Sequence, residues 1–240
     1  MMPHGDFHGV ESWVFDLDNT LYPAHCNLFA QIDARMTSFI AERLALPHDR
    51  ARFLQKDYYA RYGTTLSGLM QEHDVCPRAF MDHVHDIDLA PVESNSRLRA
   101  AMAALPGRRY VFTNGSLRHA ENVARKIGVW DLFDGAFDVE MGGYTPKPHQ
   151  GPYVLFLSHF GIAPERAAMF EDMADNLEVP HALGMRTILI QSDAAWCDDE
   201  PSHKRPSRPG ERHGHVHHVT SDLTDFLESL TSAARQGATG

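Results

Sequence analysis

Four short polar segments of this 240-residue chain, three directly after apolar stretches and one in a loop, together contain the side chains that phosphoryl transfer needs. A carboxylate nucleophile can attack phosphorus and divide one difficult displacement into two easier steps. A second carboxylate can pass a proton to the leaving group and take one from water. A lysine, a hydroxyl and main-chain amides can hold the phosphoryl oxygens as charge spreads over them. The residues in these segments are Asp16 and Asp18, then Thr113, Asn114 and Gly115, then Lys147, and last Glu171 and Asp172.

The two aspartates of the first segment predict a division of roles. We expect Asp16 to attack phosphorus, and Asp18 to protonate the leaving alkoxide and then deprotonate the hydrolytic water. Several carboxylates beside an anionic substrate repel one another, so such a site requires a cation. Mg²⁺ prefers oxygen ligands and keeps bound waters. We predict that Asp16, Asp172 and the main-chain carbonyl of Asp18 are its ligands.

The remaining segments predict groups that bind phosphate. These are Thr113, the amides of Asn114 and Gly115, and Lys147. Taken singly, each segment also has a purely structural interpretation. An aspartate after a strand can stabilise a turn, a threonine can be a helix N-cap, a loop lysine is normally solvated, and acidic residues before a helix can favour its dipole. The order and placement of all four segments favour a functional site.

The elements that must position these residues are short buried strands separated by helices. This alternation predicts a parallel sheet covered on both faces, and ligands of such sheets bind beyond the carboxyl ends of the strands. The predicted fold class is therefore α/β with a Rossmann-like parallel sheet. The strand candidates are residues 13–15, 110–112, 136–137, 167–170, 187–190 and 215–220, and helical patterns cover residues 96–105, 117–127, 152–160 and 176–183.

Residues 26–88 interrupt this alternation. Apolar residues recur at helical spacing over residues 28–40, further helix-like segments cover 53–62 and 66–73, and no strand candidate intervenes. We therefore predict an all-helical insertion after the first strand, packed as a separate small domain. Residues 198–218 are rich in Pro, Ser, Arg and His and lack apolar periodicity, which predicts a mobile loop between the last two strands.

These residues resemble the four motifs of the haloacid dehalogenase (HAD) superfamily: DLDNT at 16–20, TNG at 113–115, the lysine of TPKP at 147, and ED at 171–172. The resemblance covers about residues 12–190 and is specific as a set. It implies an HAD-like α/β core of residues 1–22 and 93–240, with a helical C1 cap of residues 23–92 inserted after the first strand. The site residues it implies are Asp16 as nucleophile, Asp18 as acid/base, Thr113 and Lys147 on phosphate, Asp172 on magnesium, and Glu171 behind that ligand.

A finer resemblance points to the pyrimidine 5′-nucleotidase-like branch. DLDNTLYP at 16–23, FEDMADNLEVPHALGM at 170–185 and HVTSDL at 218–223 are similar to that branch, which implies a nucleoside monophosphate as substrate. Asn176 takes the place where other HAD phosphatases carry a second aspartate, and Asp175 beside it is the alternative metal ligand. Residues that can contact a base or sugar, or equally pack within the insertion, are His25, Tyr58, Tyr59 and Tyr62.

Alternatives stay open at this point. A phosphatase or phosphomutase for a sugar phosphate or another small metabolite keeps both aspartates, and a phosphomutase would also need a cap that excludes water. A catalytically silent HAD-fold binding protein is the alternative of another class, although four intact motifs favour an enzyme. The four imidazoles of HGHVHH at 213–218, in the His-rich 203–218 loop, offer ligands for a transition metal. Flanking Pro and Gly favour a solvated loop there.

Composition excludes several classes of protein. The formal net charge of -10 opposes binding to a nucleic-acid polymer, which needs clustered Lys and Arg. The apolar runs are too short to span a membrane. Three separated cysteines and an N-terminus without signal-peptide features predict a reduced, cytoplasmic protein. We expect a monomer or homodimer that acts on a small phosphorylated metabolite with Mg²⁺ as cofactor.

Overall fold

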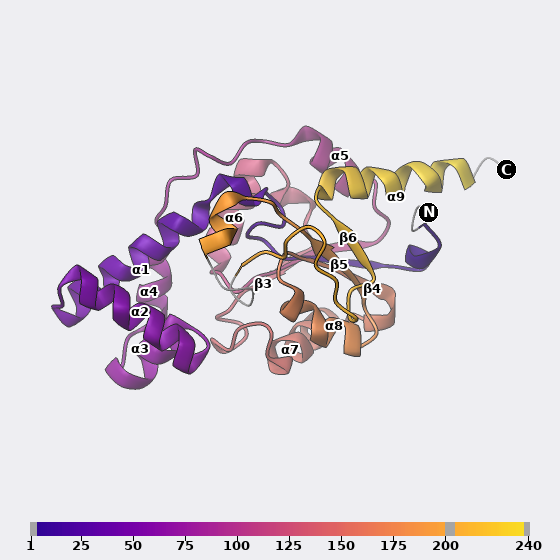
Figure 1. Cartoon of the computed structure of the whole chain (residues 1–240). Coiled ribbons are helices and arrows are strands. Elements are labelled where there is room, and N and C mark those ends of the chain that lie inside the picture. The colour runs from indigo at the N-terminus through magenta and orange to yellow at the C-terminus, as the bar shows by residue number, and fades with distance from the viewer. Residues whose placement is uncertain (1–3, 200–204, 238–240) are drawn as a thin grey trace.

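A six-stranded parallel β-sheet forms the centre of the computed structural model, which describes residues 4–199 and 205–237 (Figure 1). The strand order is β3-β2-β1-β4-β5-β6, so the direction in which the sheet grows reverses between β1 and β4. Each neighbouring pair is parallel, as the alternation of strands and helices predicts. The bounds are β1 Ser12–Phe15, β2 Arg108–Phe112, β3 Gly135–Phe137, β4 Ala167–Glu171, β5 Arg186–Ile190 and β6 His218–Thr220.

Helices cover both faces of this sheet. α5, α6 and α9 pack on one face, and α7 and α8 pack on the other. None of the helices in the described ranges is both long and apolar enough to cross a bilayer. The bounds are α5 Ser96–Ala103, α6 Leu117–Ile127, α7 Gln150–Phe160, α8 Glu178–Ala182 and α9 Leu223–Gly237, with 3₁₀ turns at His4–Phe7, Ala24–Cys26, Trp130–Leu132, Pro164–Arg166, Ala174–Leu177 and Ala195–Asp199.

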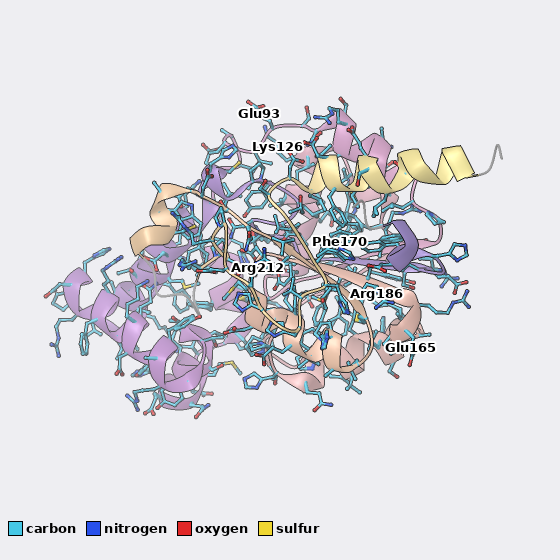
Figure 2. All side chains as sticks on the ribbon, turned by 45° about the vertical axis from the view of Figure 1, so that its right-hand side comes forward. Glu93, Lys126, Glu165, Phe170, Arg186 and Arg212 are labelled. Carbon is cyan, nitrogen blue, oxygen red and sulfur yellow. The ribbon has the colours of Figure 1, made fainter. Side chains whose placement is uncertain are left out.

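The alternation of side chains along each strand builds two apolar layers, one on each face. Phe15 and Phe170 stack with their ring centroids 4.8 Å apart in the layer under α5, α6 and α9. Val14 and Met169 point the opposite way and pack under α7 and α8. Figure 2 shows Phe170 in the interior and Arg186 at the surface. Because both faces are buried, the strands read as continuous apolar runs.

Four helices lie between β1 and α5 and extend to one side of the sheet, at the lower left of Figure 1. Their buried side chains, such as Ile40 and Leu69, belong to a third apolar cluster, distinct from the two under the sheet. The prediction of an all-helical insertion is thereby confirmed, and its division from the core at residues 22/23 and 92/93 stays a prediction. The bounds are α1 Leu28–Leu44, α2 His48–Tyr62, α3 Thr65–His73 and α4 Pro77–Val84.

The predicted strands all occur, and the differences concern helices and one loop. α4 and α9 have no counterpart in the predicted elements. The helix predicted over residues 176–183 is divided into the 3₁₀ turn Ala174–Leu177 and α8. A helix of that length would include Pro180, whose ring has no N–H to donate, so it lies in the first turn of the shorter α8.

The segment that precedes β6 is anchored, in contrast to the mobile loop that its composition predicts. Arg205 pairs with Glu211 at 2.8 Å, and Gln191 donates a hydrogen bond to the Glu211 carbonyl at 2.8 Å. The main-chain N–H of Ser207 donates to the Asp172 carbonyl at 2.9 Å. Polar contacts therefore hold residues 205–211 against the sheet, although this segment has no periodic pattern of apolar residues. The rest of the predicted loop includes residues 200–204, which lie outside the described residues.

Candidate active site

The predicted carboxylates meet where the sheet reverses, at the carboxyl ends of β1 and β4. Phe15 and Phe170 are partners in the parallel register, so Asp16 and Glu171 follow side by side. The Asp16 N–H donates to the Phe170 carbonyl at 2.9 Å and extends this pairing. Asp16, Glu171 and Asp172 are buried, and each offers a ligand oxygen within 4.8 Å of the others. Among the described residues they are the one group of three or more candidate metal ligands.

Lys147 supplies a positive charge inside this cluster. Its ammonium lies 2.6 Å from Asp16 Oδ1 and 3.3 Å from Glu171 Oε1, and it donates to the Phe112 carbonyl at 2.9 Å. The side chain is buried, unlike an ordinary solvated loop lysine. The Asn114 side chain fixes the main chain of Lys147. Its Oδ1 accepts from the Lys147 N–H at 2.7 Å, and its Nδ2 donates to the Lys147 carbonyl at 3.2 Å.

The protonation of the cluster reflects its shortage of positive charge. Burial raises the pKa of Asp16 from its ordinary 3.8 to about 8, with the Glu171 carboxylate adding to the rise and Lys147 opposing it. Burial, together with the carboxylates of Glu171 and Asp16, also raises the pKa of Asp172 well above 3.8. Burial acts to lower the pKa of Lys147, but Asp16 and Glu171 outweigh it and raise that pKa. A divalent cation fits this buried oxygen cluster, which one ammonium does not neutralise.

The carboxylates of Glu171 and Asp172 accept different hydrogen bonds from the protein. Glu171 Oε1 accepts from the Asn176 side chain, and its Oε2 accepts from the Asp172 N–H at 3.1 Å. Asp172 Oδ2 accepts from Asn19 at 3.2 Å, and Asn19 reaches it from a left-handed turn with φ 60. Asp175 is exposed on the pocket lining, outside the buried cluster. Glu171 is therefore engaged by the protein, and Asn176 is its hydrogen-bond donor.

Asp18 lies beside the cluster in a separate set of hydrogen bonds. Its Oδ1 accepts from the Tyr22 hydroxyl at 2.7 Å and lies 2.8 Å from His119 Nε2. Burial acts to raise the pKa of Asp18, but His119 and the Tyr22 hydrogen bond outweigh it and lower the pKa to about 2. Sequence reasoning did not identify either partner. Tyr22 lies four residues after Asp18, and His119 lies in the first turn of α6.

The β2–α6 turn brings His119 to Asp18. Ser116 caps α6 by accepting from the His119 N–H at 3.3 Å. The His119 ring stacks on His85, with centroids 4.4 Å apart and planes 10° apart. Gly115 leaves room for this ring, because a Cβ at that position would lie 3.3 Å from His119 Cδ2. The TNG segment therefore also shapes the space in which the imidazole packs.

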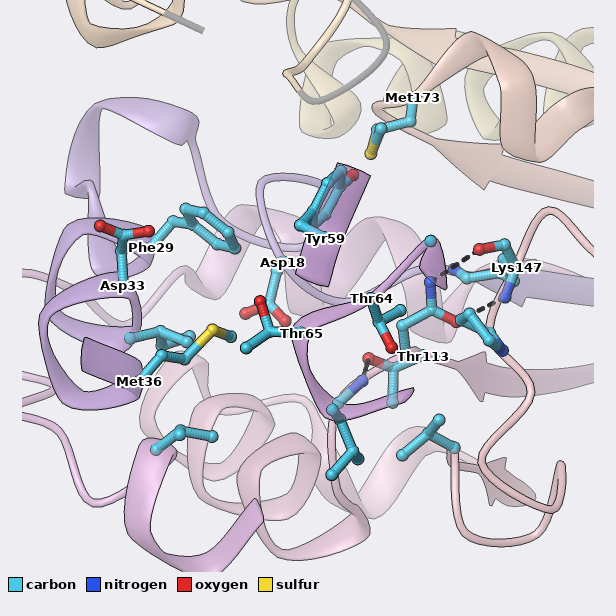
Figure 3. Close-up of a pocket in the computed structure, with 18 of the residues that line it drawn as sticks. Asp18, Phe29, Asp33, Met36, Tyr59, Thr64, Thr65, Thr113, Lys147 and Met173 are labelled. Carbon is cyan, nitrogen blue, oxygen red and sulfur yellow. Dashed lines mark hydrogen bonds between the residues drawn. The ribbon is translucent and has the colours of Figure 1, made fainter. Parts of the chain in front are cut away.

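The eight site residues predicted from the sequence all line one pocket, of about 330 Å³. Thr113 is among them, and its hydroxyl accepts from the Gly115 N–H at 2.9 Å. Figure 3 shows Thr113 and Lys147 on one side of this pocket and Phe29 and Met36 from α1 on the other, with Asp18 between them. The geometry thus combines buried carboxylates, an ammonium and a separate carboxylate under an apolar wall that the insertion provides.

The histidines of residues 213–218 do not line this pocket, and two of them have hydrogen-bond partners elsewhere. His215 Nε2 lies 2.9 Å from the Ala174 carbonyl, and His217 Nδ1 lies 2.7 Å from the Thr187 hydroxyl. Thr187 is fully buried at the start of β5. These two imidazoles therefore fasten the segment before β6 to the neighbouring elements.

A family model described as haloacid dehalogenase-like hydrolase matches residues 13–184, a range that contains all eight site residues. The chain belongs to the haloacid dehalogenase-like hydrolase family. This HAD-like hydrolase is 32% identical over 124 residues to an enolase-phosphatase E1 of Xylella fastidiosa, covering 50% of this chain and 49% of that protein. It is 26% identical over 136 residues to phosphate metabolism protein 8 of Saccharomyces cerevisiae, covering 50% and 41%. The chain thus spans half or less of the length of these curated relatives.

Solved structures share the whole architecture of this HAD-like hydrolase. An HAD phosphatase from Thermococcus onnurineus matches with a TM-score of 0.60 at 14% identity, over 94% of this chain and 98% of that chain. CbbY from Rhodobacter sphaeroides, solved in complex with phosphate, matches with a TM-score of 0.59 at 20% identity, over 92% and 99%. At these identities the matches establish the fold alone, and they include the helical insertion as well as the sheet.

The raised pKa of Asp16 predicts how stability depends on pH without a divalent cation. The folded protein keeps a proton on Asp16 that the unfolded chain loses above about pH 4, because the pKa is about 8 when folded and 3.8 ordinarily. The contribution of Asp16 to the free energy of unfolding therefore falls as pH rises from about 4 through 8. We expect the melting temperature in EDTA to decline over this range.

The matched control is Asp16→Asn, which cannot ionise. The decline in the melting temperature of this variant over the same pH range should be smaller than that of the wild type by at least about 2–4 °C. About 1 kcal/mol produces a shift of this size in a domain of this length. Mg²⁺ should raise the melting temperature of the wild type most at the alkaline end of the range. Differential scanning calorimetry at pH 5, 6, 7 and 8 measures this. Parallel curves for wild type and variant in EDTA would contradict the prediction.

Proposed function

We propose that this chain is a magnesium-dependent phosphomonoester hydrolase that acts through an aspartyl-phosphate on Asp16. The observation that carries this proposal is the pairing of a buried Asp16 carboxylate with the Lys147 ammonium at 2.6 Å, in the same pocket as Asp18. One carboxylate is thus fixed beside a cation that can also attract a phosphoryl group, while another is held apart for proton transfer. Hydrolysis of an alkyl phosphate through an acyl-phosphate needs both functions.

Asp16, Asp172 and the Asp18 carbonyl are the proposed magnesium ligands. When bound, Mg²⁺ would neutralise charge on the phosphoryl oxygens and on the carboxylates. Glu171 is proposed not to bind the cation directly, because both its oxygens already accept hydrogen bonds from the protein. Its contact with Lys147 at 3.3 Å also orients the ammonium. Removing these hydrogen bonds would free Glu171 to compete for the cation.

The first chemical step is attack by an Asp16 carboxylate oxygen on phosphorus, which breaks the bond to the leaving alkoxide. Thr113, Lys147 and the amides of Asn114 and Gly115 are proposed to hold the phosphoryl oxygens while charge spreads over them. The Gly115 N–H would then exchange its hydrogen bond to the Thr113 hydroxyl for one to the substrate. Lys147 is suited to this role because Asn114 fixes its main chain on both sides. The resulting acyl-phosphate is then open to hydrolysis.

Asp18 is the proposed proton-transfer group of both steps. Its pKa of about 2 suits the second step, since an ionised carboxylate can take the proton of the water that hydrolyses the acyl-phosphate. In the first step a poor leaving group such as an alkoxide needs a proton, and Asp18 is proposed to relay to it the proton that a singly ionised phosphate monoester brings into the site. A stabilised leaving group such as p-nitrophenolate departs without one. Tyr22 and His119 keep the carboxylate in the orientation that both transfers require.

The proposed substrate is a nucleoside monophosphate, and the support is the resemblance of residues 16–23 and 170–185 to the pyrimidine 5′-nucleotidase-like branch. Two of the curated relatives are an enolase-phosphatase and a phosphoglycolate phosphatase, which supports hydrolysis of small phosphorylated metabolites. A sugar phosphate is the second candidate. The intact set of site residues in one pocket disfavours a silent binding protein. A cytoplasmic location and a monomer or homodimer stay predictions.

Nucleophile and proton-transfer variants should separate the two aspartates. With Mg²⁺, we expect the wild type to hydrolyse nucleoside monophosphates and Asp16→Asn to show no turnover. Asp18→Asn should lower kcat by about 10²–10⁴, the usual contribution of general acid–base catalysis, and should still bind inorganic phosphate. A panel of nucleotides, sugar phosphates and p-nitrophenyl phosphate measures this. Full activity in Asp16→Asn would refute the mechanism.

His119 variants should show whether the imidazole positions Asp18. His119→Ala removes the contact to Asp18 Oδ1 and should lower kcat about tenfold, the effect of about 1.4 kcal/mol. His119→Gln keeps a donor of comparable reach and should recover most of this loss. KM should change little in either variant, since His119 contacts Asp18 and not the phosphate site. Equal activity in the Ala and Gln variants, with equal melting temperatures, would exclude a positioning role.

A further inference from the structure

The pocket extends from the carboxylate cluster to a wall that is mainly apolar. Phe29 and Met36 of α1 and Tyr59 of α2 line it from the insertion. Figure 3 shows Phe29 and Met36 across the pocket from Lys147. Phe29 keeps 37% of its surface exposed, so its ring is accessible to a ligand in the pocket. The phosphoryl group would occupy the Lys147 side, so the leaving group would meet this wall.

A further apolar contributor comes from the segment between β5 and β6. Trp196 lines the same pocket, and its indole N–H donates to the Ala24 carbonyl at 2.8 Å at the start of the insertion. The neighbouring Ala194 carbonyl accepts from the Arg208 guanidinium at 2.9 Å. The first contact fixes the indole ring, and the second fixes the main chain of the segment that carries it. An aromatic face held in this way is a surface on which a planar ring can stack.

The charges of the pocket lining are strongly biased toward carboxylates. Among the described residues that line it, the lysines are Lys56 and Lys147 and no arginine is present. Lys147 is engaged by Asp16, and the Lys56 ammonium lies 2.7 Å from Asp33 Oδ1. Burial and the neighbouring His119 lower the pKa of His85 to about 3, so its imidazole is neutral. The carboxylates are Asp16, Asp18, Asp33, Glu171, Asp172 and Asp175.

A negatively charged leaving group would therefore find, among the described residues of this lining, no cation without a carboxylate partner. A carboxylate carried by the leaving group would lose water against an apolar wall and gain no compensating charge partner there. A neutral ring would instead bury apolar surface against Phe29 and Trp196, which is favourable. The same pocket thus favours a neutral leaving group with a ring and disfavours a charged one.

We propose that this pocket selects monoesters whose leaving group is uncharged and carries an apolar ring face, and that it discriminates against leaving groups with a carboxylate or a second phosphate. The inference rests on the proposed function, since it concerns what is attached to the phosphoryl group that Asp16 receives. Phe29 and Trp196 are the specificity-determining side chains. A nucleoside belongs to the favoured class, and the two-carbon acid of phosphoglycolate belongs to the excluded class.

The test compares kcat/KM for a pyrimidine nucleoside 5′-monophosphate and for phosphoglycolate with Mg²⁺. In the wild type the nucleotide should be preferred at least about tenfold, one step of about 1.4 kcal/mol. Phe29→Lys places an ammonium on the apolar wall and should lower this ratio about tenfold. The matched control is Phe53→Lys, because Phe53 is 63% exposed on α2 and lies outside the pocket lining. It should leave the ratio unchanged.

The outcomes separate this inference from the proposed function. A wild type that prefers phosphoglycolate, or a ratio that Phe29→Lys leaves unchanged, overturns the inference while hydrolysis itself stands. No turnover of any monoester with Mg²⁺ contradicts the proposed function and the inference with it. Circular dichroism confirms that both variants fold. If Phe29→Lys does not fold, the ratio measured for the wild type decides the question.

Discussion

Three carboxylates and one ammonium share a buried space at the end of the sheet, and the rest of the site is arranged around this charge imbalance. Asp16, Glu171 and Asp172 would all be ionised in water, yet burial raises the pKa of Asp16 to about 8. Lys147 compensates part of this charge from 2.6 Å. The cluster is therefore poised to accept further positive charge, and a bound cation would make Asp16 an ionised nucleophile near neutral pH.

The topology of the sheet creates this imbalance with few residues. β1 and β4 are sequence-distant neighbours in parallel register, so the residues that follow them face the same edge. The order of strands leaves β2 on the other side of β1, and its following turn carries the TNG segment to Lys147 and His119 to Asp18. The insertion after β1 then places an apolar wall over the charges. In the proposed mechanism, phosphoryl chemistry and selection of the leaving group thus belong to different parts of the chain.

Much of this could be predicted because it depends on local patterns. Buried parallel strands leave continuous apolar runs, and the predicted site residues stand directly after them or in a Pro-flanked loop. Of the partners of Asp18, His119 was missed because it is distant in sequence and owes its position to the α6 cap. Tyr22 is close in sequence, but no periodic pattern marks its hydroxyl as a partner of the carboxylate. α9 was missed although Leu223, Leu227 and Leu230 have helical spacing. The segment at 205–211 was mistaken for a mobile loop because polar hydrogen bonds leave no periodic signal.

The most direct test of the central claim is to trap the phosphorylated nucleophile. In Asp18→Asn, p-nitrophenyl phosphate can still phosphorylate Asp16, because p-nitrophenolate needs no proton to leave, whereas hydrolysis lacks its base. Acid quenching, borohydride reduction and peptide mass spectrometry should then reveal homoserine in place of Asp16. Modification of another carboxylate, or none while p-nitrophenolate is released, would contradict the assignment of Asp16 as the nucleophile.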